Sequence, residues 1–155
     1  MALSDYLRED LILLDLHPTD MEECLRIMVD QASSCGAIPD APDALRRLLE
    51  RERTMSTGLG GGVAVPHAKT DKVRHQVVAL GRVLDGVDFK AIDGKPVHLV
   101  FLLLGPPDST RQHVDLLARI AYLVKAPGVI DALLAAATPQ QILEVLRQEA
   151  RERRL

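Results

Sequence analysis

Apolar residues in this chain follow two patterns, and the first is typical of β-strands. A short apolar run at residues 11–16 (LILLDL) suits a buried strand. Residues 75–84 (HQVVALGRVL) are rich in β-branched side chains, which favours a second strand, although their mixed alternation does not identify its buried face. The near-continuous apolar run at residues 97–106 predicts a strand that is covered on both faces. This last run is the best candidate for the central strand of a sheet.

The second pattern places apolar residues three and four positions apart, which predicts helices. Thr19 and Glu22 have the spacing of a capping box at the start of a helix over residues 20–34. Asp40 is the expected cap of a second helix, which should fray near Arg53. The apolar stripe of this second helix consists of Leu45, Leu48 and Leu49.

Two further helices are expected in the C-terminal third of the chain. Ser109 and Gln112 have the spacing of another capping box. Thr138 is the expected cap of the last helix, with Pro139 at the favoured first position and Gln141 three residues after the cap. The apolar stripe of the first of these two helices consists of Leu116, Leu117, Ile120 and Leu123.

Helical and strand patterns alternate along the chain without a Ser/Gly-rich linker or a low-complexity tract. This alternation predicts a layered α/β sandwich, although it does not define the order of the strands. The chain has 155 residues and is 47% apolar, which is enough for one domain with a core, and we expect a single domain over residues 1–155. The end of the chain, residues 148–155, is expected to be solvated and frayed.

Charge and composition exclude several classes of partner. The net charge of −3 and the 3% aromatic content argue against a nucleic-acid-binding surface. The N-terminal segment carries acidic residues where a signal peptide would be basic, and its apolar run is too short to span a bilayer. We therefore expect a cytoplasmic protein without direct membrane insertion.

The histidines and cysteines do not indicate a metal centre. Cys24 and Cys35 lack a C-x-x-C spacing and are expected to be reduced thiols. The five histidines and two cysteines together show no recognisable ligand spacing. We expect neither a metal nor a cofactor.

The segment STGLGGGVAVPH (residues 56–67) is the most informative part of the sequence. Glycines tolerate positive φ, so successive N–H groups of this loop could converge on an anion; the candidates are Gly58, Gly60, Gly61 and Gly62. A flexible hairpin with an incidental histidine is an equally good interpretation from composition alone. Walker and dinucleotide-binding loops are excluded, because the required lysine and the required following helix are missing.

His67 is a candidate nucleophile at the end of this loop. Pro66 favours an extended backbone before it. A neutral imidazole can accept a phosphoryl group near neutral pH, because its ordinary pKa is about 6.5. Transfer of that group needs mainly alignment and charge stabilisation, so a nearby cation, Arg51 or Arg53, would assist it.

Three stretches of the sequence together resemble a known family. They are ERERTMSTGLGGGVAVPHA, DGVDFKAIDGKPVHLVFLLLGP and DSTRQHVDLLARIAYL. They resemble the fructose, mannitol and nitrogen-related enzyme IIA components of the bacterial phosphoenolpyruvate-dependent phosphotransferase system, over residues 11–146. The resemblance implies a mixed β-sheet flanked by helices, an α/β/α sandwich.

The resemblance also implies site residues and partners. His67 matches the histidine that is phosphorylated on Nε2 by the phosphocarrier protein HPr or a paralogue of it. His113 matches the second active-site histidine and Arg51 an arginine near the phosphate. Ser56 and Thr57 are expected to hydrogen-bond the loop or the phosphate.

Several functions remain open on the sequence. The likeness of STGLGGGVAVPH favours the freestanding nitrogen-related type, which signals by its phosphorylation state to regulated target proteins. A sugar-specific enzyme IIA of the fructose or mannitol type, which donates phosphate to an enzyme IIB domain, is the alternative. A phosphate-independent regulatory binding module is the second alternative, and a phosphohistidine hydrolase would need a water-activating group that the sequence does not identify.

Overall fold

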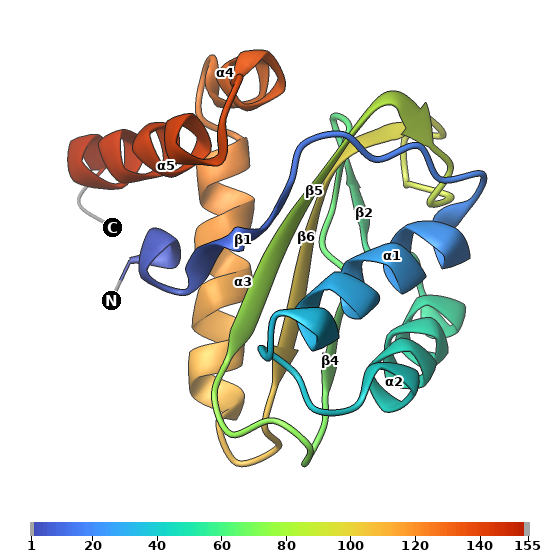
Figure 1. Cartoon of the computed structure of the whole chain (residues 1–155). Coiled ribbons are helices and arrows are strands. Elements are labelled where there is room, and N and C mark those ends of the chain that lie inside the picture. Colours follow the sequence, from blue (N-terminus) through green and yellow to red (C-terminus); the bar gives the residue numbers. More distant parts are fainter. Residues whose placement is uncertain (1, 154–155) are drawn as a thin grey trace.

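The computed structural model describes residues 2–153 and forms a mixed sheet between two layers of helices (Figure 1). In chain order the elements are η1 (Leu3–Asp5), β1 (Leu7–Leu13), α1 (Met21–Ser34), α2 (Ala41–Thr54), β2 (Gly58–Gly60), β3 (Val63–Ala64), β4 (His67–Lys69), β5 (Val77–Val87), β6 (Val97–Gly105), α3 (Thr110–Val124), α4 (Val129–Ala135) and α5 (Pro139–Arg153). The strands follow the order β1-β5-β6-β3-β2, and β4 pairs with β6. Pairing of β5 with β6 is antiparallel, whereas β1 is parallel to β5, and β3 and β4 are parallel to β6. The expected α/β class is confirmed.

The central strand β6 separates two apolar cores. Helices α1 and α2 cover one face of the sheet, and α3, α4 and α5 cover the other (Figure 1). Side chains of β6 alternate between these cores: Val100, Leu102 and Leu104 face α1 and α2, whereas Leu99, Phe101 and Leu103 face the other helices. The prediction that this apolar run is covered on both faces is therefore confirmed.

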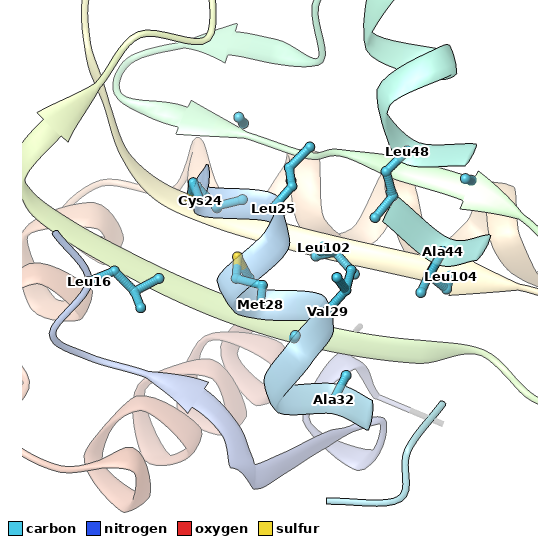
Figure 2. Packing of buried hydrophobic residues seen from close by; sticks show 14 of the residues in the cluster. Leu16, Cys24, Leu25, Met28, Val29, Ala32, Ala44, Leu48, Leu102 and Leu104 are labelled. Atoms are coloured by element: carbon cyan, nitrogen blue, oxygen red, sulfur yellow. The ribbon is translucent and has the colours of Figure 1, made fainter. Parts of the chain in front are cut away.

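Helix α1 buries one apolar stripe against the sheet (Figure 2). Leu25, Met28 and Val29 are fully buried and recur at helical spacing. They lie over the sheet in Figure 2, where Met28 contacts Gly81 of β5 and where Leu102 and Leu104 of β6 belong to the same core. Burial of each such side chain stabilises the folded state by about 1.5–3 kcal/mol relative to leaving it exposed to water.

The predicted first strand is displaced along the chain. Strand β1 begins at Leu7 and ends at Leu13, instead of covering residues 11–16. It lies at an edge of the sheet, where the exposed polar residues 8–10 are tolerated and break the apolar pattern. A register irregularity between Leu7 and Ile12 interrupts its pairing with β5. Edge position, which the sequence pattern does not report, explains the shift.

Two of the predicted capping boxes are wrong. Asp20, not Thr19, caps α1 by accepting a hydrogen bond from the Glu23 amide at 2.8 Å. Ser109 makes no side-chain capping bond to α3, and Gln112 donates to the Tyr6 hydroxyl at 2.6 Å instead.

The third cap, at α5, is confirmed. The Gln141 amide donates to the Thr138 hydroxyl at 3.2 Å. The Gln141 side chain in turn accepts a bond from the Ala137 amide at 2.6 Å, one residue before the cap.

The C-terminal part is more helical than expected. The sequence pattern did not indicate α4, and α5 continues to Arg153 although fraying was predicted from residue 148. Ala150 is buried and the Arg153 guanidinium lies 5.7 Å from the centre of the Tyr122 ring, so the last turns pack against α3. Residues 154–155 of the predicted tail lie outside the described residues.

Candidate active site

His67 is positioned by the sheet. It is the first residue of β4 and pairs with Leu103 of β6, whose amide donates to the Pro66 carbonyl at 2.9 Å. The His67 ring is half-buried, and its Nδ1 lies 2.7 Å from the Val65 carbonyl oxygen. Because a carbonyl oxygen can only accept, Nδ1 carries the proton. The neutral ring therefore has its lone pair on Nε2, where it is available for nucleophilic attack.

The surroundings of His67 favour this neutral form. Burial lowers the pKa of His67 below 6.5, and the positive charge of Arg51 lowers it further. The hydrogen bond to Val65 and the negative charge of Glu52 act in the opposite direction without cancelling the shift. At neutral pH the Nε2 lone pair is therefore free.

His113 lies close to His67 in the fold although the two residues are far apart in the sequence. It lies in the first turns of α3, which directly follows β6, and is only 3% exposed. The centres of the two imidazole rings are 5.7 Å apart and the ring planes are inclined by 55°. A segment of 45 intervening residues thus separates two rings that meet at the carboxyl end of β6.

Gln76 fixes the orientation of His113. Its side-chain nitrogen lies 3.4 Å from the Ser109 carbonyl, so its oxygen faces His113 Nδ1 at 3.1 Å. This arrangement places the His113 proton on Nδ1 and leaves Nε2 unprotonated. A Cβ at Gly105 would overlap the Gln76 amide, so a larger residue there would displace Gln76 from His113.

His113 is strongly biased toward the uncharged form. Burial lowers its pKa from 6.5 to about 4, and the nearby His67 and Lys69 lower it in the same direction. Two neutral imidazoles therefore face the site at pH 7.

Three cations share a cleft with the two histidines. The cleft has a volume of about 560 Å³, and its charged lining consists of Arg47, Arg51 and Lys69 together with one carboxylate, that of Glu50. Arg51 donates to the Met55 carbonyl at 2.7 Å, and Lys69 to the Thr110 hydroxyl at 2.8 Å. Lys69 stands two residues after His67 in one strand, so both side chains lie on the same face. The cleft combines a nucleophilic nitrogen with positive charge.

Arg51 and Arg53 lie in different places. Arg51 lines the cleft of His67 and influences its pKa. Arg53 lines a separate cavity together with Ser56 and Phe89. The structure therefore brings Arg51, and not Arg53, to the histidines.

The other predicted phosphate-binding residues do not line the cleft. The Ser56 hydroxyl donates to the Phe89 carbonyl, and the Thr57 hydroxyl is held by the buried Glu52 carboxylate. The amide of Gly58 donates to the Ser56 oxygen at 3.0 Å. These hydrogen bonds stabilise the segment that leads from α2 into the hairpin of β2 and β3.

The glycine hairpin is separated from His67 along the sheet. Gly62 accepts a bond from the His98 amide at the start of β6, whereas His67 pairs with Leu103. Five residues of strand correspond to about 16 Å. The Gly61 amide donates to the Asp93 carboxylate at 3.0 Å. Gly60, Gly61 and Gly62 have positive φ, as predicted, whereas Gly58 does not, and the turn that they form is closed by a carboxylate of the same chain, away from His67.

Lys69, Arg47 and Gln76 are site residues that the sequence interpretation missed. Lys69 could have been found, because the segment was expected to be extended and a period of two places it beside His67. Gln76 has no local signal, since it reaches His113 only through the fold.

The described residues provide neither a cluster of metal ligands nor a membrane-spanning helix. Among residues 2–153 there is no group of three or more His, Cys, Asp or Glu side chains that could hold a metal ion. Within the same range, no helix has both the length and the apolar character needed to cross a bilayer.

The chain is similar to several known proteins in sequence and in fold. Residues 5–149 match the family model "Phosphoenolpyruvate-dependent sugar phosphotransferase system, EIIA 2". The chain is 36% identical over 139 residues to a fructose-specific EIIA component of Haloferax volcanii, covering 90% of both chains. It is 32% identical over 148 residues to a fructose-specific EIIABC component of Bacillus subtilis, covering 96% of this chain but only 23% of that longer protein.

A solved structure extends the comparison to a regulatory protein. The crystal structure of nitrogen regulatory protein IIA-Ntr from Neisseria meningitidis matches with a TM-score of 0.87 and 28% identity, covering 93% of this chain and 98% of that chain. The expected resemblance is thereby confirmed at the level of both sequence and fold. The chain belongs to the EIIA type 2 family of the phosphoenolpyruvate-dependent phosphotransferase system.

Proposed function

We propose that this protein is a phosphohistidine carrier that accepts a phosphoryl group from phospho-HPr, or a paralogue of HPr, on Nε2 of His67. The bond between phosphorus and the donor's histidine nitrogen breaks as the bond to His67 Nε2 forms, and the donor nitrogen keeps the electron pair. The observation that carries this proposal is the bond from His67 Nδ1 to the Val65 carbonyl, because it leaves Nε2 unprotonated in a cleft lined by cations.

His113 and the cations are proposed to stabilise the transferring group. A phosphoryl group on His67 would bring negative charge toward His113, whose ring centre is 5.7 Å away, and would favour protonation of His113 Nε2. The resulting N–H then donates to a phosphoryl oxygen. Arg51 and Lys69 add positive charge from two other elements of the cleft.

The onward step has two candidate forms. The relatives include sugar-specific components and a nitrogen regulatory protein, so the family assignment covers both uptake and regulation. In the first form, phospho-His67 donates to an enzyme IIB domain; in the second, its phosphorylation state governs binding to target proteins. A phosphate-independent binding module uses the same fold but no chemistry at His67.

Mass spectrometry after incubation with phosphoenolpyruvate, enzyme I and HPr tests the proposal. We expect one acid-labile phosphoryl group, mapped by fragmentation to His67. The His67→Gln variant should remain unlabelled, while the matched His17→Gln variant, changed at an exposed histidine outside the cleft, should be labelled normally. Stoichiometric labelling of a folded His67→Gln protein would refute the assignment.

Two further additions distinguish the candidate functions. Replacing HPr by its nitrogen-related paralogue tests donor preference. Adding a fructose-type enzyme IIB domain to the labelled protein tests sugar-specific transfer, since loss of label to that domain is expected only for an uptake component. No labelling by either authentic donor would favour the phosphate-independent module.

A further inference from the structure

A second cleft lies on the far side of Gln76 from the candidate active site. It has a volume of about 460 Å³ and is formed by the start of β1, the turn after α1 and the segment before β5. We call it the basic cleft. It is lined by Tyr6, Arg8, Leu11, Gly36, Ala37, Pro39 and residues 72–77.

The basic cleft has a one-sided charge. Arg8, Lys72 and Arg74 line it together with His75, and no Asp or Glu is among its lining residues. This contrasts with the net charge of −3 of the whole chain. Concave sites lined by one sign of charge attract ligands of the opposite sign.

The positive charge of the basic cleft is only partly neutralised. Arg8 forms an ion pair with Asp10 at 2.6 Å and donates to the Cys35 carbonyl at 3.2 Å, at the C-terminal end of α1. Asp71, the residue before Lys72, does not line the basic cleft and instead faces Arg47 of the candidate active site at 4.0 Å. Among residues 2–153, no carboxylate forms an ion pair with Lys72 or Arg74. Two cations therefore remain available to a ligand.

The wall of the basic cleft is directly bonded to helix α3. Gln76 lines the cleft and faces His113 Nδ1 at 3.1 Å. The hydroxyl of Tyr6, another lining residue, accepts a bond from the neighbouring Gln112 at 2.6 Å. A ligand in the cleft thus contacts the residues that hold the first turns of α3 and the His113 ring.

The apolar part of the lining limits the kind of ligand. Leu11, Ala37, Val73 and Val77 provide an apolar wall beside the cations. A cleft of this volume suits a small molecule with a short carbon framework and at least two negative charges. Carboxylate and phosphate groups both meet this requirement, since Arg and Lys bind either.

We propose that the basic cleft binds a small polyanionic metabolite and that its occupancy changes how Gln76 holds His113. Binding itself does not depend on phosphotransfer. Its consequence for the reaction rests on the proposed function, because it acts through the orientation of His113.

Calorimetric titration of the whole chain with citrate and with pyrophosphate tests the binding. Citrate represents carboxylates and pyrophosphate represents phosphates, and sodium chloride at equal ionic strength controls for screening. We expect saturable binding of at least one probe to the wild type. The double variant Lys72→Gln/Arg74→Gln should bind about tenfold more weakly or worse, because both free cations are lost.

The matched control is Arg26→Gln/Lys125→Gln, which removes the same two charge types at exposed positions on α1 and after α3. It should bind like the wild type. Equal weakening in both double variants would mean non-specific attraction and would overturn the proposal, as would the absence of saturable binding by either probe. Reduced affinity of the Lys72/Arg74 variant for phospho-HPr without any binding of the small anions would assign the cleft to protein docking instead, and would also overturn it.

The coupling is read independently of activity by the ¹⁵N resonances of the His113 ring. They should shift on addition of the probe to the wild type and not in the Lys72→Gln/Arg74→Gln variant. Binding without any change at His113 would refute the coupling, whereas failure of His67 labelling would leave the binding result standing.

Discussion

The buried His113 should make the stability of this protein unusually sensitive to mild acid. Its pKa is about 4 in the folded chain, chiefly because of burial, against 6.5 as the ordinary value. Because the folded-state pKa is the lower one, the unfolded chain binds more protons between these values. Stability is therefore lost as the pH falls through 6.5, and the loss is complete near pH 4.

The size of the effect follows from the two pKa values. Between pH 7 and pH 5, a shift from 6.5 to about 4 lowers the free energy of unfolding by about 2 kcal/mol. The His113→Gln variant lacks this titration. The difference in unfolding free energy between wild type and variant should therefore change by about 2 kcal/mol over this pH range, whatever the variant costs at pH 7.

Urea denaturation of both proteins at pH 7, 6 and 5 measures this difference. Taking the difference cancels most of the acid sensitivity that the carboxylates contribute to both proteins. As a control, the Ile92→Ala variant, changed at an exposed position without a titratable group, should keep the pH dependence of the wild type. Parallel curves for wild type and His113→Gln would refute the conclusion that His113 is buried in the neutral form.

Two other substitutions test the cleft and the core. Lys69→Gln should slow phosphotransfer from phospho-HPr by about 100-fold, because it removes a cation beside His67. The control Lys95→Gln, at an exposed position, should not slow it. Equal rates for the two variants in stopped-flow or quench assays would exclude a role for Lys69. Arg82→Met should lower the free energy of unfolding by about 3 kcal/mol or more, because the buried Arg82 guanidinium donates to the Leu14 carbonyl and to carbonyls at the end of α4. Urea denaturation checks this, and a loss no greater than that of Arg119→Met, which breaks a surface pair with Asp115, would contradict it.

The parts of the fold that the sequence predicted are those where one local pattern decides the outcome. Residues 97–106 are apolar on both faces, and only a central strand buries both, so β6 was identifiable. Strand β1 was misplaced because an edge strand carries exposed polar residues that interrupt the apolar run. Helix α4 is short and was not indicated.

The site was predictable only where residues are close in sequence or carry a recognisable motif. His67 and His113 were found through the motif, and the structure brings their rings together. Gln76 was not found, because its contact with His113 depends on how the segment before β5 meets α3. The glycine hairpin illustrates the converse case, in which residues close in sequence are far apart in the fold. An extended chain advances about 3.3 Å per residue, so Gly61 was close to His67 in sequence but far from it along the sheet.

The arrangement of charge explains how, under the proposed function, a phosphoryl group can be both held and released. Arg51 and Lys69 are already bonded, to the Met55 carbonyl and the Thr110 hydroxyl, so contacts with a phosphoryl group replace existing ones. His113 must take up a proton against a folded-state pKa of about 4 before it can donate. Both requirements reduce the free energy by which the site stabilises the phosphoryl group, compared with a site whose cations have no other partners. A carrier needs this moderation, because a phosphohistidine bound too favourably would not pass its group on.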